Sequence, residues 1–116
     1  MQRTYIKELS KKVTEEVLIK GWVNIRRDQG KMIFLDFRDM TGIVQGVILP
    51  NQIEALEQGK KLRQEFVVEV VGKVNERPER NRKVGILNGD IELEILKITI
   101  LVLQIPFKWW KVFIFF

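Results

Sequence analysis

Short turn signals divide most of this chain into stretches in which apolar and polar residues alternate. In residues 32–39 (MIFLDFRD), Ile33, Leu35 and Phe37 point to one face of an extended chain, and the residues between them point to the other. A period of two is the period of a β-strand, because successive side chains of a strand alternate between its faces. The chain is therefore expected to be built mainly from strands.

Five segments have the composition or the alternation of strands. They cover residues 15–27, 32–39, 43–49, 66–74 and 90–101. Turn signals at residues 28–31 and 40–42 connect the first three as a meander. Gly21 is expected to form a bulge at which the first strand bends.

Two helices are expected outside these strands. Thr4 is expected to cap a short N-terminal helix that ends near Lys12. Between the third and fourth strands, Pro50 suits the first turn of a helix that runs to about Glu65. Gly59 weakens this helix by about 1 kcal/mol relative to Ala.

The order of these elements indicates an all-β fold. Three meander strands, a helix and two more strands are the element order of a five-stranded OB-fold barrel, which binds oligonucleotides on the face of its second and third strands. The pattern also fits another small barrel or an α+β sheet with the same elements. One domain at residues 1–101 accounts for all five strands, in keeping with the usual domain size of about 100–150 residues.

Composition narrows the chemistry that this chain can perform. Its 116 residues include neither Cys nor His, which excludes thiol nucleophiles, disulfides, zinc fingers and imidazole bases. A Gly-rich phosphate loop and a nucleophile beside a base are also absent, so no catalytic residue and no metal site is expected. The formal charge of +5 favours an anionic partner such as nucleic acid or an acidic membrane surface.

Cations and one aromatic side chain gather on the first two strands. Arg26 and Arg27 end the first strand, and Lys31 lies in the following turn. Arg38 shares a strand face with Phe34. A base stacked on an aromatic ring contributes about 1–3 kcal/mol to binding. Phe34 also fits a partly buried position in the barrel wall, but the charges on its face favour a binding role.

A second group of charges follows the fourth strand, in residues 77–83 (RPERNRK). Its composition fits a solvated hairpin loop as well as a contact with nucleic acid. In an OB barrel the loop between the fourth and fifth strands borders the binding face. The position of the loop therefore favours nucleic acid where its composition alone does not.

Residues 21–46 (GWVNIRRDQGKMIFLDFRDMTGIVQG) resemble the N-terminal anticodon-binding domain of bacterial-type aspartyl-tRNA synthetases. That family has a GWV segment, an RRD-x-G turn, an IF-x-D-x-RD strand and a GIVQ strand. The segments LRQEFVVEVVGKVNERPE and NGDIELEIL continue the resemblance in the expected order, so that it covers roughly residues 3–100. The asparaginyl and lysyl enzymes share the barrel and match these segments less closely.

The resemblance implies a role for individual residues. It implies that Phe34 stacks on an anticodon base and that Gln45 hydrogen-bonds the edge of the central base. The residues that it places around the anticodon loop, as phosphate or base contacts, are Arg27, Arg63, Arg77, Asn81 and Glu92. Ile25 and Asn75 stand where the family commonly has Arg, so weaker binding than in the family is expected. The implied partner is the anticodon stem-loop of tRNA(Asp).

Members of this family continue into a class II catalytic domain that binds ATP, Mg²⁺ and aspartate, and none of its motifs occurs in this sequence. The chain alone is therefore expected to use no cofactor or small-molecule substrate and not to be an enzyme. Because Lys7, Glu8 and nearby charges interrupt any secretory signal, a cytoplasmic location is expected.

The last residues, 102–116 (VLQIPFKWWKVFIFF), differ from the rest in composition, since six of the 11 aromatic residues lie in the last ten positions. We expect this apolar aromatic tail to lie outside the fold, as the product of a shifted or prematurely ended reading frame. About ten residues with two lysines are too few to span a bilayer. A membrane-spanning role is therefore disfavoured, while an anchor at the membrane interface remains an alternative.

Four functions fit the sequence. The leading one is an anticodon-binding module from an aspartate-tRNA ligase, and the main alternative is a general single-stranded DNA- or RNA-binding OB protein. A membrane-surface or oligomerising protein driven by its tail is a third, and a product of a decayed gene without function is a fourth.

Overall fold

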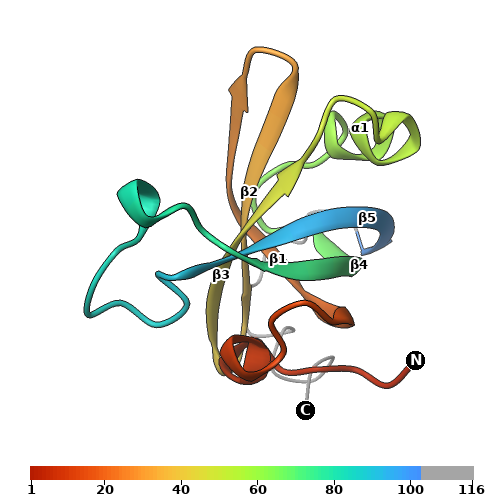
Figure 1. Cartoon of the computed structure of the whole chain (residues 1–116). Helices are drawn as coiled ribbons and strands as arrows, with labels where there is room; N and C mark the ends of the chain where they lie inside the picture. The colour runs from red at the N-terminus through yellow and green to blue at the C-terminus, as the bar shows by residue number, and fades with distance from the viewer. Residues whose placement is uncertain (103–116) are drawn as a thin grey trace.

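Five strands close into a barrel in the computed structural model, which describes residues 1–102 (Figure 1). The strands are β1 (Glu16–Gln29), β2 (Met32–Asp39), β3 (Gly42–Ile48), β4 (Val67–Glu76) and β5 (Ile91–Val102). Around the barrel they follow the order β1-β2-β3-β5-β4, in which β3 and β5 are parallel and the other neighbouring strands are antiparallel. The expected five-stranded OB barrel is confirmed.

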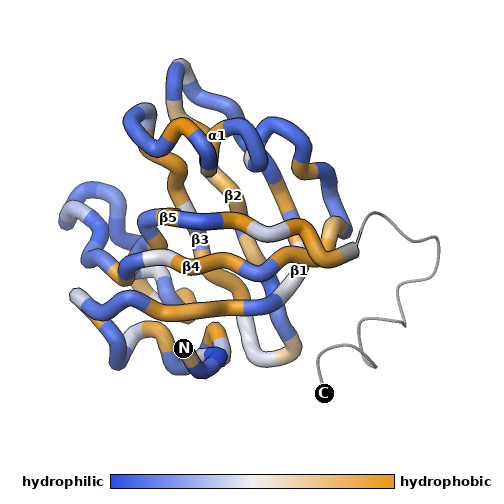
Figure 2. The backbone as a smooth tube through the Cα atoms, turned by 90° about the vertical axis from the view of Figure 1, so that its right-hand side faces the viewer, coloured by the Kyte–Doolittle hydropathy of each residue, from blue (hydrophilic) through white to orange (hydrophobic). Residues whose placement is uncertain are grey.

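The alternation of the sequence matches the two faces of the barrel wall. On β2, Ile33, Leu35 and Phe37 are buried, while Phe34 between them is partly exposed. On β5, Ile91, Leu93 and Ile95 are buried, as the alternation of the sequence predicts. Figure 2 shows stretches of apolar residues along the strands. The inner face supplies the core, so the outer face of the same strands is available for binding.

The sequence predicts a bulge in β1 at Gly21, and this prediction is wrong. The bulge lies between Val23 and Ile25, where the register with β2 shifts. Gly21 serves a different purpose, because a methyl group at this position would collide with the backbone carbonyl of Arg38. Its lack of a side chain permits the close approach of β1 and β2.

The N-terminal helix is a 3₁₀ helix, η1 (Ile6–Lys11), and the expected cap at Thr4 is wrong. The backbone N–H of Thr4 instead donates to the carbonyl of Leu18 on β1, at 2.7 Å. The first turn of η1 is capped from elsewhere in the chain, since the N–H of Ile6 donates to the carboxylate of Asp39 at 2.9 Å. A distant strand end therefore positions this helix.

Asp39 is 3% exposed and also holds the turn between β2 and β3. Its Oδ1 accepts hydrogen bonds from the N–H of Thr41 (2.7 Å), the hydroxyl of Thr41 (2.6 Å) and the N–H of Gly42 (3.2 Å). Because Oδ2 binds the N–H of Ile6, one buried carboxylate connects the N-terminal segment to the barrel.

The second helix, α1 (Ile53–Gly59), is much shorter than the expected helix over residues 50–65. It ends at Gly59, where an added methyl group would clash with the side chain of Ile48. The chain then turns and buries Leu62 in the core. The views in Figures 1 and 2 place α1 and η1 at opposite ends of the barrel.

Of the tail expected at residues 102–116, Val102 belongs to β5, and the remainder lies outside the described residues. Within residues 1–102, the helices are too short to cross a membrane.

Candidate nucleic-acid interface

An open groove of about 560 Å³ lies on the outer face of β2 and β3, beside the loop that follows β4. This loop contains the short 3₁₀ helix η2 (Glu79–Asn81). Six of the seven anticodon-loop residues that the sequence predicts line this groove: Arg27, Phe34, Gln45, Arg77, Asn81 and Glu92. Residues from four strands and one loop therefore converge on a single surface.

A chain of hydrogen bonds fixes the polar side chains of the groove. The guanidinium of Arg27 donates to both carboxylate oxygens of Asp36, at 3.1 and 3.2 Å. It also donates to Oε1 of Gln45 at 3.3 Å. Nε2 of Gln45 in turn donates to Oε2 of Glu92 at 2.9 Å. These contacts connect β1, β2, β3 and β5 across the outer face of the barrel.

These hydrogen bonds fix the orientation of the Gln45 amide. The guanidinium of Arg27 can only donate hydrogen bonds and the ionised carboxylate of Glu92 can only accept them. The carbonyl oxygen of Gln45 must therefore face Arg27, and its amino group must face Glu92. An amide held in this way keeps one N–H and one lone pair for a ligand.

Phe34 supplies the flat surface of the groove. Its register partners are Arg27 on β1 and Val47 on β3, and its side chain is partly exposed. Nucleobases that are not paired can stack on such a ring with little sequence preference. The hydrogen-bonded polar side chains beside the ring offer donors and acceptors that can distinguish one base edge from another.

Arg77 forms the floor of the groove where the loop leaves β4. It is only 7% exposed, and its Nε donates to the carbonyl of Ile91 at 2.7 Å. In the described part of the chain, no carboxylate forms an ion pair with Arg77. Its guanidinium therefore carries a positive charge that a phosphate group of a ligand can neutralise.

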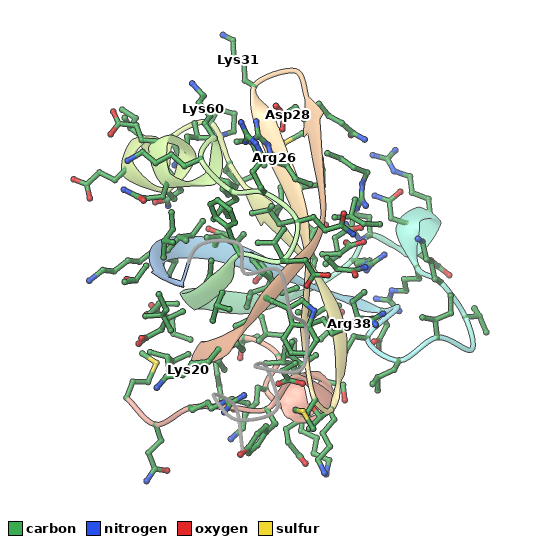
Figure 3. All side chains as sticks on the ribbon, turned by 180° about the vertical axis from the view of Figure 1, so that it is seen from behind. Lys20, Arg26, Asp28, Lys31, Arg38 and Lys60 are labelled. Carbon is green, nitrogen blue, oxygen red and sulfur yellow. The ribbon has the colours of Figure 1, made fainter. Side chains whose placement is uncertain are left out.

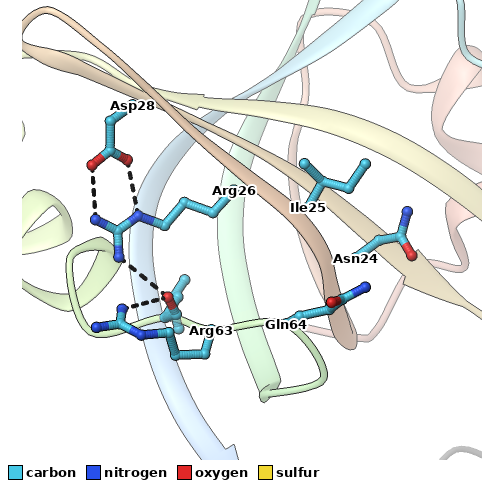
Figure 4. A pocket seen from close by; sticks show the side chains of 7 residues that line it. Asn24, Ile25, Arg26, Asp28, Arg63 and Gln64 are labelled. Atoms are coloured by element: carbon cyan, nitrogen blue, oxygen red, sulfur yellow. Dashed lines mark hydrogen bonds and ion pairs between the residues drawn. The ribbon is translucent and has the colours of Figure 1, made fainter.

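Arg63, the seventh predicted residue, does not lie in the groove. It lines a separate hollow near the bulge of β1, together with Arg26 (Figure 4). Nη1 of Arg63 donates to the carbonyls of Lys60 (3.3 Å) and Leu62 (3.1 Å). The structure thus separates Arg63 from the other six residues.

Arg26 fastens the connection between α1 and β4 to β1. It donates to both carboxylate oxygens of Asp28, at 2.9 and 2.8 Å, and to the carbonyl of Lys60 at 2.7 Å. The hydrogen bond that Arg26 donates to Asp28 raises the pKa of the Arg26 guanidinium. The same contact, aided by the charges of Arg26, Arg63 and Lys60, holds the pKa of the Asp28 carboxyl below its usual range.

Lys31 and Arg38, two further cations that the sequence analysis names beside Phe34, lie at opposite ends of β2. Lys31 is exposed at the tip of the hairpin between β1 and β2, and Arg38 is exposed near the end of β2 that leads to β3 (Figure 3). Neither side chain lines the groove. They therefore add only to the wider positive field of the protein.

Asp36 is the member of the site that the sequence did not predict. It lies on the same outward face as Phe34 and forms the ion pair with Arg27, with 19% of its side chain exposed. The sequence does contain a signal for this ion pair, because Arg27 and Asp36 are opposite charges on the outward faces of neighbouring strands.

Two residues depart from the family pattern, in which Arg is common at their positions. Ile25 is 44% exposed, and Asn75 donates to Glu94 at 2.9 Å. Within residues 1–102, no group of three or more acidic side chains is placed to hold a metal ion.

Residues 17–101 match the tRNA anti-codon family, whose members are described as OB-fold nucleic acid binding domains. The chain belongs to this family. The match includes all five strands except Glu16, the first residue of β1, and Val102, the last residue of β5. The groove is therefore the outer face of an anticodon-binding OB domain.

Relatives of this OB domain include two bacterial ligases. An aspartate–tRNA(Asp/Asn) ligase of Corynebacterium glutamicum is 43% identical over 103 residues, which are 87% of this chain and 17% of the ligase. An aspartate–tRNA ligase of Streptococcus suis is 43% identical over 91 residues, which are 77% of this chain and 15% of the ligase. The chain thus spans less than a fifth of the length of these relatives.

The fold is also found in a solved structure, that of asparaginyl-tRNA synthetase from Pyrococcus horikoshii in complex with asparaginyl-adenylate. It matches 93% of this chain with a TM-score of 0.75 and 32% identity, and the match covers 24% of that synthetase. The comparisons thus identify residues 17–101 as an OB domain of the kind found in such synthetases.

Proposed function

We propose that this OB domain binds the anticodon stem-loop of tRNA(Asp), as the part of a cytoplasmic aspartate–tRNA ligase that takes part in tRNA aminoacylation. The observation that carries the proposal is the convergence of six predicted residues on one groove. The identity of 43% to aspartate–tRNA ligases supports the choice of amino acid and tRNA.

Each part of the groove suits one part of an RNA loop. Phe34 stacks on an unpaired base, and the fixed amide of Gln45 hydrogen-bonds the edge of the central base. Glu92 accepts a hydrogen bond from a base amino group, as on the edge of guanine. Asn81 contacts the loop from η2. Arg77 at the floor of the groove neutralises a phosphate.

The preformed chain of hydrogen bonds lowers the cost of this recognition. Arg27 already holds the carbonyl of Gln45, and Glu92 already holds its amino group. The RNA therefore meets side chains whose orientation is set before binding, and less conformational entropy is lost on association. No cofactor is needed for such binding.

A competition experiment tests the proposal against general single-strand binding. The full chain is bound to a fluorescent hairpin that carries the aspartate anticodon loop, and unlabelled hairpin or poly-dT is then added. The proposal predicts that the hairpin competes well and poly-dT poorly. Effective competition by poly-dT and not by the hairpin would contradict the proposal and support a general single-strand binder.

The variant Gln45→Ala adds a test of the named site. It removes the amide that reads the central base, so affinity for the hairpin is expected to fall. Gln58→Ala is the matched control, because Gln58 is an amide on α1 that does not line the groove. Equal affinity of Gln45→Ala and Gln58→Ala for the hairpin would contradict the role assigned to Gln45.

A further inference from the structure

The loop between η2 and β5 carries three apolar side chains that are exposed to solvent. Val84 is 97% exposed, Ile86 is 57% exposed and Leu87 is 49% exposed. A single exposed aliphatic residue is ordinary on a protein surface. Three such residues within four positions, beside a cationic groove, are unusual, and we call them together the apolar loop surface (Val84, Ile86 and Leu87).

Hydrogen bonds close this loop at its base. The N–H of Lys83 donates to the carbonyl of Gly89 at 2.9 Å, and the N–H of Gly89 donates to the carbonyl of Ile86 at 2.9 Å. A methyl group on Gly89 would collide with the carbonyl of Lys83, so the two sides of the loop are as close as backbones permit.

One side chain then ties the closed loop to the barrel. Asn88 is 4% exposed, and its Nδ2 donates to the carbonyls of Ile6 at 3.1 Å and Ile43 at 3.0 Å. The carbonyl of Ile6 belongs to η1, and that of Ile43 belongs to β3. The loop is thus attached to two distant elements, while its apolar side chains still face solvent.

Two residues of the apolar loop surface, Ile86 and Leu87, lie beside the groove. Arg82 and Lys83, at the start of the loop, line the groove. Ile86 and Leu87 line a smaller hollow of about 190 Å³ that shares its other wall with the groove. The residues that border both the groove and the hollow are Arg27, Gln45, Arg77 and Lys83. A ligand that extends from the groove into this hollow therefore meets Ile86 and Leu87, two positions or more from Val84.

We propose that Val84 and Ile86 contact the base or ribose of one further RNA nucleotide, next to those held in the groove, while Lys83 contacts its phosphate. This inference rests on the proposed function, because it takes the RNA loop as the occupant. A cation beside apolar side chains matches a nucleotide, which has a charged phosphate and an apolar base face. Aliphatic side chains do not read hydrogen-bonding edges, so this contact tolerates any base.

The affinity test uses the double variant Val84→Ser/Ile86→Ser in the full chain. Affinity for the anticodon hairpin is expected to fall about fivefold, near the lower limit for loss of one stacked base. The dependence of affinity on salt is expected to stay the same, since no charge is removed. The matched control is Ile53→Ser, because Ile53 is 68% exposed on α1 and lies outside the groove.

Methyl resonances in NMR give a second readout that does not depend on the folding of a variant. When the hairpin is added to the wild-type chain, the methyl groups of Val84 and Ile86 are expected to shift and that of Ile53 is not. Unshifted methyl groups of Val84 and Ile86 in the bound state would overturn the inference.

The outcomes separate this inference from the proposed function. If Phe34→Ala weakens hairpin binding and the double variant does not, the RNA is bound in the groove and the apolar loop surface has no part in it. If the wild-type chain does not bind the hairpin, the proposed function itself fails. If the double variant keeps its affinity but converts a dimer into a monomer in sedimentation, the occupant is a second copy of this chain and the inference is wrong.

Discussion

Gln45 on β3 donates a hydrogen bond of 2.9 Å to Glu92 on β5, close to where these two strands pair in parallel. The two residues are 47 positions apart in the sequence. Their contact is possible because β5 crosses the barrel and enters between β3 and β4. The topology of the barrel thus brings the amide of Gln45 and the carboxylate of Glu92 to the same surface.

The first prediction concerns this contact. Gln45→Glu places a second carboxylate beside Glu92 and removes the donor between them. We expect this variant to lose about 1–3 kcal/mol of stability, the usual cost of a partner left without its hydrogen bond. Urea unfolding measures the loss. Gln45→Ala is the control that adds no charge, and a Gln45→Glu chain at least as stable as Gln45→Ala would contradict the prediction.

The second prediction concerns the buried carboxylate that joins the N-terminal segment to the barrel. Asp39→Ala leaves the N–H groups of Ile6 and Thr41 without their acceptor. Because an unsatisfied buried donor costs about 1–3 kcal/mol, a loss of about 3 kcal/mol in the free energy of unfolding is expected. Asp90→Ala, at an exposed carboxylate, is the control and should change stability by less than about 0.5 kcal/mol. Similar stability of the two variants would refute the anchoring role of Asp39.

The third prediction concerns the close approach of β1 and β2. In Gly21→Ala, the added methyl group meets the carbonyl of Arg38, and the strands must separate. A destabilisation of about 1–3 kcal/mol is expected, as for other overpacked sites. Thermal unfolding measures it, with Lys20→Ala on the same strand as the control. Equal unfolding temperatures of Gly21→Ala and Lys20→Ala would contradict the prediction, because the strands would then accommodate the methyl group without loss of stability.

The fourth prediction concerns the pH dependence of stability. The ion pair with Arg26 lowers the pKa of Asp28 in the folded chain, so its carboxylate stabilises the fold above the pKa of the unfolded state. This stabilisation is lost as the pH falls through the lowered pKa. NMR titration of the Asp28 carboxyl is expected to give a pKa below the usual range, and Arg26→Ala should return it to that range. A pKa for Asp28 that Arg26→Ala leaves unchanged would contradict the assigned cause.

The sequence predicted the barrel because alternation is a local property. Each strand shows its inward face within a few residues, as Ile33, Leu35 and Phe37 do on β2. The cap of η1 was missed because its acceptor, Asp39, lies 33 residues away from Ile6. The length of α1 was overestimated because contacts with the core, not helix propensity, decide that the chain turns after Gly59.

The position of a side chain was predictable where the strand face alone decides it, and less so where neighbouring residues differ only in their contacts. Phe34 and Gln45 lie where their positions on the strands place them. Arg26 and Arg27 look equivalent in the sequence, but adjacent residues of a strand point to opposite sides. Arg27 therefore joins the groove, while Arg26 binds Asp28 and the α1–β4 connection.

The affinity of Phe34→Ala for the anticodon hairpin tests the central claim most directly. The aromatic control is Tyr5→Ala, since Tyr5 is 40% exposed near the N-terminus and lies outside the groove. Fluorescence anisotropy should show that Phe34→Ala binds about 5- to 150-fold more weakly than wild type, the effect of losing one stacked base. Tyr5→Ala should bind like wild type. Equal affinities of wild type, Phe34→Ala and Tyr5→Ala for the hairpin would contradict binding of the anticodon loop in this groove.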